Sequence, residues 1–380
     1  MAKSKDKNLS LPYHRIVAKF GTSLLTGGSE RLDRDVMSNL VAQVAQLHER
    51  GREVVVVSSG AIASGRHRLG LARKLKGIPF KQVLASVGQY YLMQAYEQLF
   101  QQHGITVAQA LLAKADLVDR AGYLNARNTL LALLELKVLC VVNENDVVAV
   151  DELEEARFGD NDNLSAMVAN LIDADLLLLL TDAAGLYTAD PHRNANARLI
   201  PEVRQIDSAI ERLAADTYGD LGTGGMITKL EAARLATASG VTVVVADGRE
   251  PDVVLRVAGG EAVGTRFLPV ASKLESRKRW MLSGLSTKGK LVVDSGAATA
   301  LRKQKRSLLA AGIREVEGIF QRGDIVNIYD PGGVQLGCGI TNYGSADINA
   351  IKGTHSRKII TLLGYDYGSE VVHRSNLVVL

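Results

Sequence analysis

The segment RIVAKFGTS, residues 15–23, sets the pattern that decides the fold of this chain. Arg15–Phe20 is a short, largely apolar run, and it predicts a buried parallel strand rather than a surface helix. Gly21 follows at once, where the backbone must turn, and Lys19 stands near the end of the run. Such a turn directs backbone N–H groups and one ammonium group toward an anion. A solvated lysine beside an ordinary turn accounts for this segment equally well.

Short apolar runs of the same kind recur up to about residue 246, with helical patterns between them. Further strands are predicted over Glu53–Ser58, Ile105–Gln109, Val138–Asn143, Leu176–Thr181 and Val241–Ala246. Helices are predicted over Asp33–Arg50, Lys81–His103, Asp119–Leu136, Asn163–Ile172 and Met226–Ser239. This alternation predicts an α/β sandwich whose loops collect at the strand ends, which is where chemistry is expected.

The sequence changes character after Pro269. The stretch ASKLESRKRW, residues 271–280, is charged and lacks strand periodicity, so it predicts a linker. Three strands are predicted beyond it, over Gly289–Asp294, Asp324–Tyr329 and Gln335–Ile340. We therefore expect a tail over residues 1–12, an α/β domain over 13–270, a linker over 271–287, a small mostly-β domain over 288–371 and a second tail over 372–380.

Length and composition narrow the class of protein. A chain of 380 residues is long enough for two domains, and 47% apolar with 23% charged residues is typical of globular proteins. No apolar run reaches the roughly 18 residues of a membrane helix, and the first residues lack the apolar core of a secretory signal. Cys140 and Cys338 are far apart and have no metal-ligand neighbours, which fits a reducing compartment. We expect a cytoplasmic protein without a membrane partner.

Charge is distributed unevenly between the two predicted domains. Residues 271–380 hold 16 Lys/Arg and 9 Asp/Glu, whereas the first 270 residues hold 29 and 32. The second domain is therefore basic and the first slightly acidic. This asymmetry suggests different partners for the two domains.

Small hydroxyl residues and a glycine follow the second predicted strand, in the segment SSGAI, residues 58–62. They lead into a helix whose free N–H groups attract negative charge. A helix N-cap without a ligand is the alternative, because Ser also favours that position. Capping alone does not account for Gly60.

Two clusters of carboxamides and carboxylates stand at the ends of predicted elements. The segment NEND, residues 143–146, ends one strand, and GDNDN, residues 159–163, precedes a helix. Together they offer the donors and acceptors that an amino acid with ammonium and carboxylate groups needs. A turn rich in Asn and Asp is often only a turn, but two of them at one sheet edge favour a binding site.

Two further loops favour phosphate binding. The strand Leu176–Leu180 opens onto TDAAGLY, and GTGGMITK, residues 222–229, places three glycines and two threonines before a helix. Glycines let backbone amides approach phosphate oxygens, and Lys229 can neutralise charge on a transferring group. A flexible linker is the alternative for residues 222–229. A P-loop is excluded, because the chain contains no GxxxxGK[ST].

No general base or nucleophile stands out in these loops. Phosphoryl transfer does not demand one, because an ionised carboxylate is already a nucleophile. Alignment and charge neutralisation can then carry the catalysis. The loops therefore suit transfer of a phosphoryl group.

In this order and spacing, the segments KFGTSLLTGG, SSGAIASG, NENDVV, FGDNDNLSA, LLLLTDAAGLYTADP and GLGTGGMITKL closely resemble the glutamate 5-kinases of the amino acid kinase family. The resemblance implies an αβα sandwich. It also implies ATP-dependent phosphorylation of the glutamate side-chain carboxylate, with Mg2+, to γ-glutamyl phosphate and ADP, the first step of proline biosynthesis. The same fold acting on aspartate, acetylglutamate or a nucleotide is the alternative.

The resemblance assigns roles to single residues. Lys19 and Lys229 would hold and neutralise the phosphoryl group, and Asp162 would orient both lysines. Glutamate would be bound by Ser59, Asp146 and Asn161, with Asn143 as a neighbour. ATP would be bound by Lys19, Thr181, Asp182, Thr223, Gly224, Gly225, Met226, Ile227, Thr228 and Lys229, and its phosphates would carry most of the metal. Substrate affinity and feedback sensitivity are expected to vary with the loop DELEEARF, residues 151–158.

The unit from about residue 288 to 371 resembles a PUA domain, a small β-rich fold that elsewhere often binds RNA. The resemblance rests on GKLVVDSGAATAL, FQRGDIVNIYD and YGSADINAIKG. A basic cluster there, Arg302, Lys303, Lys305 and Arg306, would suit RNA phosphates. We favour a solvated cluster in a domain kept for assembly or regulation. An RNA-binding protein with an idle kinase domain is the third hypothesis.

The resemblance also implies partners. Proline is expected to inhibit the enzyme, and the chain is expected to form homo-oligomers. A glutamate-5-phosphate reductase is a candidate partner, because the acyl phosphate product hydrolyses and cyclises readily.

Overall fold

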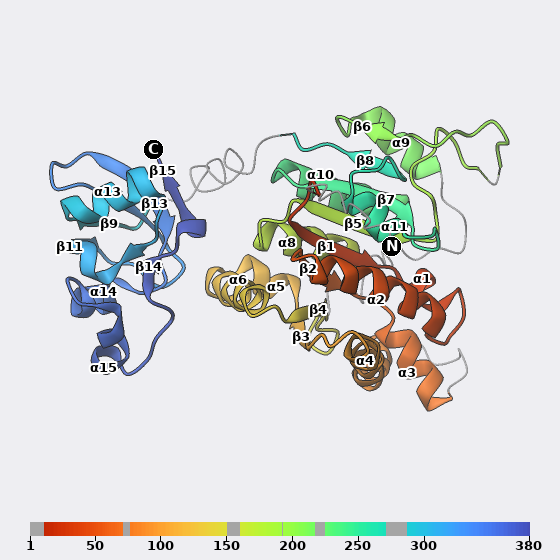
Figure 1. Ribbon diagram of the computed structural model, residues 1–380, viewed down its shortest axis with the longest axis horizontal. Helices are drawn as coiled ribbons and strands as arrows, with labels where there is room; N and C mark the ends of the chain where they lie inside the picture. Colours follow the sequence, from red (N-terminus) through yellow and green to blue (C-terminus); the bar gives the residue numbers. More distant parts are fainter. Residues whose placement is uncertain (1–10, 71–76, 150–159, 192, 217–224, 271–286) are drawn as a thin grey trace, which may run out of the picture. The chain divides into compact units, whose positions relative to one another are not determined.

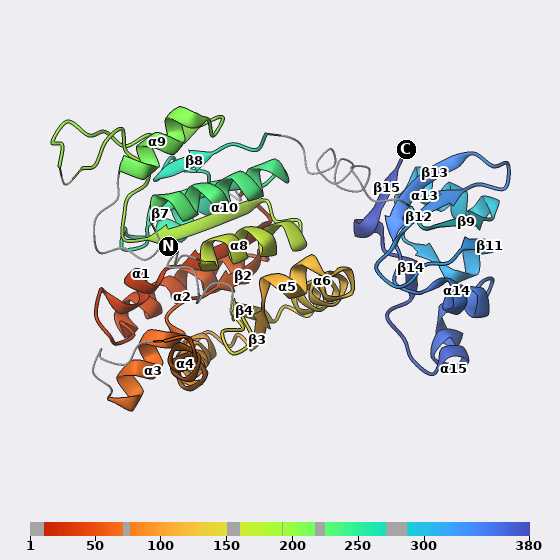
Figure 2. The same cartoon turned by 180° about the vertical axis from the view of Figure 1, so that it is seen from behind.

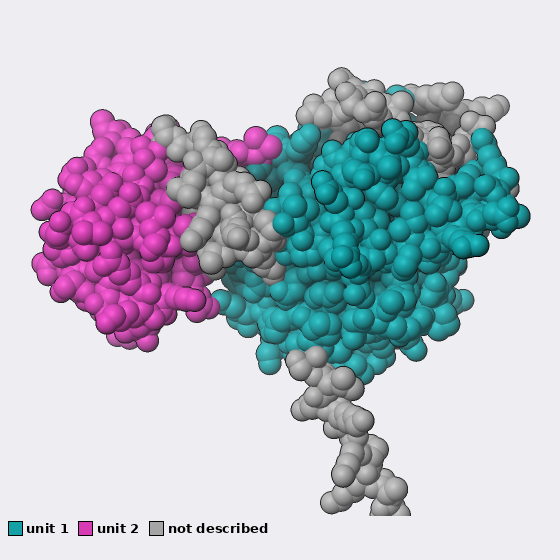
Figure 3. Space-filling model, turned by 90° about the horizontal axis from the view of Figure 1, so that it is seen from above, with its two compact units in different colours: residues 1–117, 126–272 teal, residues 118–125, 273–380 magenta. Residues whose placement is uncertain are grey.

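The computed structural model describes residues 11–70, 77–149, 160–191, 193–216, 225–270 and 287–380. It forms two compact units, which Figure 3 colours separately. Unit 1 comprises residues 1–117 and 126–272, and unit 2 comprises residues 118–125 and 273–380. The predicted linker lies outside the described residues except for Thr287, as does the predicted N-terminal tail except for Leu11 and Pro12.

Unit 1 is built on a largely parallel sheet (Figure 1). In spatial order its strands are β3 (Val107–Leu112), β4 (Leu139–Glu144), β2 (Glu53–Val57), β1 (Arg15–Phe20), β5 (Leu176–Thr181), β7 (Thr242–Asp247), β8 (Thr265–Phe267) and β6 (Glu202–Val203). β8 runs antiparallel to β7, whereas β1 pairs in parallel with β2 on one side and β5 on the other. Nearly all side chains of these three central strands are buried, which explains why their sequences are continuous apolar runs.

Helices cover both faces of the sheet, as the two opposite views in Figures 1 and 2 show. The helices of unit 1 among the described residues are α1 (Thr22–Thr26), α2 (Arg34–Glu49), α3 (Ala61–Leu69), α4 (Ile78–Gln101), α5 (Lys114–Val118), α6 (Arg120–Glu135), α8 (Asp160–Leu171), α9 (Ser208–Asp216), α10 (Met226–Ala238) and α11 (Val253–Ala258), with Val118 of α5 and the first residues of α6 counted in unit 2. α2, α4 and α11 share a core with Ile16, Ala18 and Val56 of the sheet. α8 and α10 cover the opposite face. The predicted αβα sandwich is confirmed.

Several predicted boundaries differ from the structure by one to three residues. The strand predicted over Ile105–Gln109 is β3, Val107–Leu112, because this edge strand alternates half-buried and exposed side chains and has no continuous apolar run. The helix predicted from Asn163 begins at Asp160. Asn161 and Asp162 therefore lie in the first turn of α8 rather than in the loop before it, and the helix fixes their directions.

Two glycines bring α3 and α4 into close contact. A Cβ atom on Gly65 would lie 1.9 Å from the carbonyl oxygen of Leu84, and one on Gly88 would lie 1.8 Å from that of Ala61. Neither contact is compatible with a side chain. The glycines therefore set how closely α4 approaches α3, and α3 begins directly after Ser59 and Gly60.

Unit 2 contains a five-stranded sheet and a two-stranded sheet. In spatial order the larger sheet is β11 (Ile313–Gly318), β9 (Gly289–Val293), β12 (Ile325–Tyr329), β13 (Gln335–Ile340) and β15 (Leu377–Val379), and the smaller pairs β10 (Leu308–Leu309) with β14 (Glu370–Val372). Short helices complete it: α13 (Ser295–Gln304), η1 (Ala310–Gly312), α14 (Ser345–Ile351), η2 (Ser356–Lys358), α15 (Ile359–Leu363) and η3 (Arg374–Asn376). The unit is mostly β, as predicted.

The end of the chain differs from the predicted tail over residues 372–380. β15 pairs with β13 and adds the last strand of the larger sheet. Val378 is fully buried, and its neighbour Leu377 belongs to the core of the unit. Three residues are too few for a periodic signal in the sequence, and the strand forms because β13 offers it a partner.

Candidate active site

The central strands of unit 1 bring several polar segments to one edge of the sheet. β1, β2, β4, β5 and β7 all end there in parallel. The sheet also has its topological switch point here, because the chain proceeds from β1 to β2 on one side and reaches β5 on the other. In open α/β sheets this is the usual place for a ligand.

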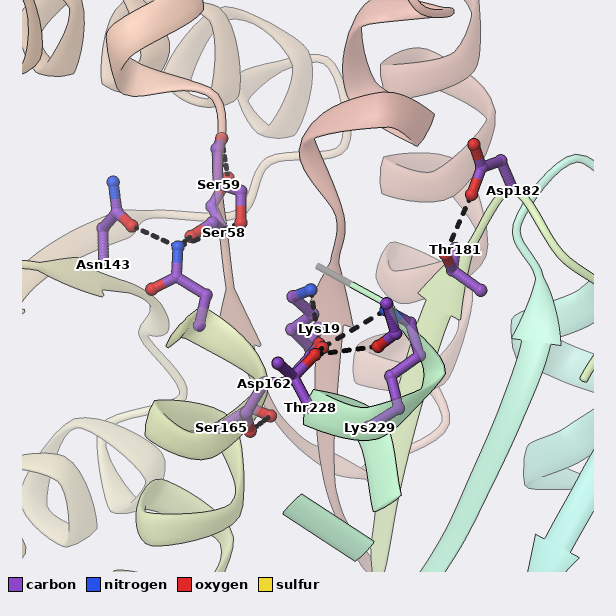
Figure 4. A network of polar contacts seen from close by, with 12 residues as sticks. Lys19, Ser58, Ser59, Asn143, Asp162, Ser165, Thr181, Asp182, Thr228 and Lys229 are labelled. Atoms are coloured by element: carbon purple, nitrogen blue, oxygen red, sulfur yellow. Dashed lines mark hydrogen bonds and ion pairs between the residues drawn. The ribbon is translucent and has the colours of Figure 1, made fainter. Parts of the chain in front are cut away.

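Asp162 is the centre of the most buried polar group at this edge. Its Oδ1 lies 2.5 Å from Nζ of Lys19 and its Oδ2 lies 3.2 Å from Nζ of Lys229. The Thr228 hydroxyl donates to Oδ2 at 2.8 Å. Figure 4 shows the two lysines and Thr228 converging on this carboxylate from β1 and α10.

Burial strengthens the electrostatic interactions among the charged side chains of this group. Asp162 is 0% exposed, Lys19 6% and Lys229 5%. Burial opposes ionisation of Asp162, but the ammonium groups of Lys19 and Lys229, with hydrogen bonds from Lys19 and Thr228, outweigh it and hold the pKa of Asp162 below its ordinary value. The three groups together carry one net positive charge, which suits an anionic ligand.

A second polar group surrounds the amide of Asn161 one residue earlier on α8. Its Nδ2 lies 2.7 Å from the carbonyl oxygen of Ser58, 2.9 Å from Oγ of Ser59 and 3.0 Å from Oδ1 of Asn143. Asn161 Oδ1 is buried and has no hydrogen-bond partner among the described residues. α8 thus presents Asp162 to the lysines and Asn161 to the ends of β2 and β4.

The sequence reasoning missed Gln89, which belongs to the same group. Asn143 Nδ2 donates to Gln89 Oε1 at 2.7 Å. Gln89 lies in the middle of α4, where the only available signal was a polar residue beside the contact glycine Gly88. That signal does not indicate a site without the tertiary structure.

Asp146 lies in the turn after β4 and is half-buried. The backbone N–H of Asn145 donates to the carbonyl oxygen of Leu112 at 3.1 Å, and Gln82 Nε2 donates to the carbonyl oxygen of Val147 at 3.0 Å. The turn is therefore tied to β3 on one side and to α4 on the other. The loop over residues 151–158, with which substrate affinity and feedback sensitivity are expected to vary, lies outside the described residues.

The residues expected at ATP fall into two groups. Thr181 is the last residue of β5 and Asp182 follows it. The Thr181 hydroxyl donates to Asp182 Oδ1 at 3.1 Å, and Figure 4 shows both residues apart from Asp162. Gly225, Met226, Ile227, Thr228 and Lys229 form the N-cap and first turn of α10, and Thr223 and Gly224 lie outside the described residues. Among the residues that the structure describes, no side chain caps this helix start, and no acidic residue stands in its first turn. Such a terminus attracts phosphate.

The basic cluster predicted in unit 2 lies at the end of α13. Arg302 approaches Asp330 Oδ2 at 3.7 Å, and Lys305 caps the helix in the left-handed conformation. These features explain the cluster as a solvated helix end. They do not by themselves indicate a ligand.

Two protein families match this chain. The pattern of the amino acid kinase family matches residues 14–247, and that of the PUA domain matches residues 289–363.

No helix among the described residues is both long and apolar enough to cross a membrane.

Several curated proteins resemble the chain over almost its whole length. A glutamate 5-kinase of Dehalococcoides mccartyi strain CBDB1 is 60% identical over 97% of this chain and 99% of its own. Those of Herpetosiphon aurantiacus and Photobacterium profundum are each 51% identical, over 98% and 99% of this chain and 99% and 98% of their own. The chain therefore belongs to the glutamate 5-kinases of the amino acid kinase family.

Proposed function

We propose that this protein transfers the γ-phosphoryl group of ATP to the side-chain carboxylate of glutamate, giving γ-glutamyl phosphate and ADP. The observation that carries this proposal is the buried group in which Lys19 and Lys229 flank Asp162. It holds two cations in fixed positions at the sheet edge where ligands bind. The identity with glutamate 5-kinases supports glutamate as the acceptor.

The two lysines would act on the group in transfer. An oxygen of the glutamate carboxylate attacks the γ-phosphorus, and the bond from that phosphorus to the β,γ-bridging oxygen breaks. The electron pair leaves with ADP, and no proton is transferred. Asp162 holds both ammonium groups in place before the substrates arrive, so that their reorganisation does not add to the barrier. Lys19 and Lys229 then neutralise charge on the phosphoryl oxygens in the transition state.

The second polar group would recognise the amino acid. Asn161 Oδ1 is a buried acceptor that suits the α-ammonium group of glutamate, and Ser59 lies beside it with a hydroxyl. Asp146 supplies a carboxylate in the neighbouring turn. We propose that these residues bind glutamate, and that Thr181, Asp182 and the start of α10 bind ATP.

We propose that Mg2+ enters with the nucleotide. Among the described residues, no cluster of three or more His, Cys, Asp or Glu side chains could hold a metal ion. This part of the chain does not fit a protein-built metal site, whereas Mg2+ is commonly bound by substrate phosphates and water. The metal would neutralise phosphate charge.

Trapping the product tests the proposal. The protein is incubated with glutamate, Mg-ATP and hydroxylamine, which converts the acyl phosphate into a hydroxamate. We expect hydroxamate with glutamate and little with aspartate or acetylglutamate. A yield no higher than that of the Lys229→Ala control would refute the kinase, and a higher yield with another acceptor would refute the substrate.

We propose further that proline inhibits the reaction at the glutamate site. Proline carries the same α-amino and α-carboxylate groups, so Asn161 and its neighbours offer it the same hydrogen bonds. Inhibition competitive with glutamate is expected in the hydroxamate assay. Noncompetitive inhibition, or none at millimolar proline, would exclude an overlapping site.

A further inference from the structure

A line of carboxamide side chains leads from α4 to the sheet edge. Gln89 Oε1 accepts from Asn143 Nδ2 at 2.7 Å, and Asn143 Oδ1 accepts from Asn161 Nδ2 at 3.0 Å. Asn143 is only 2% exposed, so bulk water does not replace these partners. Gln89 stands at the start of the line and lies outside the sequence segments that carry the family resemblance.

The hydrogen bonds in this line set the directions of Asn143 and Asn161. Gln89 Nε2 is buried and has no hydrogen-bond partner among the described residues, so Gln89 joins the line through its Oε1 alone. A carboxamide has a donor at one end and an acceptor at the other, so the partner of either end decides which way it faces. Gln89 Oε1 holds the NH2 group of Asn143, and Asn143 Oδ1 therefore faces Asn161. That oxygen, together with the Ser58 carbonyl and the Ser59 hydroxyl, holds the NH2 group of Asn161.

The free end of the line is an acceptor. Asn161 Oδ1 is buried without a hydrogen-bond partner among the described residues, which is unfavourable until a ligand supplies a donor. An ammonium group is such a donor. If Asn161 faced the other way, its NH2 group would meet that ammonium and repel it.

We propose that Gln89 is a positioning residue for the amino-acid substrate, fixing Asn143 and thereby Asn161 so that Asn161 Oδ1 accepts a hydrogen bond from the substrate α-ammonium. This inference rests on the proposed function. The close contact of Gly88 with Ala61 of α3, where no larger residue fits, fixes the backbone of α4 next to Gln89. Gln89 acts through Asn143 and does not touch the reacting atoms.

The first test replaces Gln89 by Met, which keeps the length of the side chain and removes its acceptor. We expect KM for glutamate to rise about tenfold, which corresponds to about 1.4 kcal/mol of lost orientation. We expect kcat and KM for ATP to stay within about threefold. Gln98→Met is the matched control on the same helix, since Gln98 is exposed and Oε1 accepts from Arg34 Nη2 at 3.0 Å. It should leave all three constants unchanged.

Three further measurements separate positioning from general support of the fold. If Gln89 acts through Asn143, Gln89→Met adds nothing to the glutamate KM of an Asn143→Ala variant. Glutarate has both carboxylates of glutamate but no ammonium group, so its inhibition constant should be the same in Gln89→Met and in the natural protein. Gln89→Glu keeps an acceptor for Asn143 and should restore KM to within about threefold.

Three results would overturn the inference: an unchanged glutamate KM in Gln89→Met, additive effects with Asn143→Ala, or a glutarate constant that rises as much as the glutamate KM. If Gln89→Met does not fold, Gln89→Ala enters the same assays with the same expected outcomes. The natural protein reports on the proposed function separately. If the natural protein forms no glutamate hydroxamate, the kinase assignment fails. If the natural protein is active and the Gln89 variants have an unchanged glutamate KM, only the role of Gln89 is refuted.

Discussion

Replacing Asp162 by Asn tests the centre of the site most directly. The change keeps the shape of the side chain but leaves Lys19 and Lys229, residues that are only 6% and 5% exposed, without their shared counter-charge. Removing one partner of a buried ion pair costs about 3–5 kcal/mol. In a domain of this size each kcal/mol lowers Tm by roughly 2–4 °C, so we expect a fall of about 10 °C.

Thermal unfolding measures the fall in Tm, and the hydroxamate assay measures the effect of the substitution on kcat. We expect kcat to fall by roughly 10²–10³, as when one preorganised electrostatic group is lost from an active site. Asp182→Asn is the matched control for stability, because that side chain is 45% exposed and should change Tm by little. An Asp162→Asn protein with the natural Tm and kcat would refute the reasoning.

The pH dependence gives an independent check of the same charge. The pKa of Asp162 is lowered in the folded state, so the unfolded state binds the proton more readily. The stabilisation is therefore complete above the unfolded value of about 3.9 and is lost as pH falls through the lower folded value. The difference in unfolding free energy between the natural protein and Asp162→Asn should shrink below about pH 4, and a constant difference would contradict this assignment.

Four other substitutions test separate parts of the structure. Lys19→Ala and Lys229→Ala should each lower kcat by roughly 10²–10³ with little effect on glutamate KM, because charge neutralisation matters most in the transition state; steady-state kinetics in which only KM changes would argue against this role. Asp146→Ala should raise glutamate KM about tenfold or more, and an unchanged KM would exclude it as a ligand. Gly88→Ala should lower the free energy of unfolding by about 1–3 kcal/mol in denaturant titrations, because its Cβ would lie 1.8 Å from the Ala61 carbonyl oxygen; a stabilised variant, as expected for an ordinary helical Gly→Ala change, would show that the two helices separate easily.

The sequence alone determined the layers of the kinase unit and the positions of its loops. Buried parallel strands have side chains that contact helices on both faces, and they therefore appear as continuous apolar runs such as those of β1 and β5. Glycine-rich and polar segments directly after these runs are local features. Lys19, Ser59, Thr181 and Lys229 were predicted from them or from the family resemblance that they carry.

Apart from the contact of Asp162 with Lys19 and Lys229, which the family resemblance implied, only the tertiary structure decided which of these side chains meet. Lys229 and Asp162 are 67 positions apart, and Asn143 and Gln89 are 54 apart, yet each pair is within hydrogen-bond distance. The start of α8 at Asp160 and the close packing of α4 on α3 place Asp162 and Gln89 there. Local sequence cannot specify such contacts, because they depend on strand order and helix packing between distant segments. β15 likewise depends on a contact between distant segments, since its three residues form a strand only beside β13.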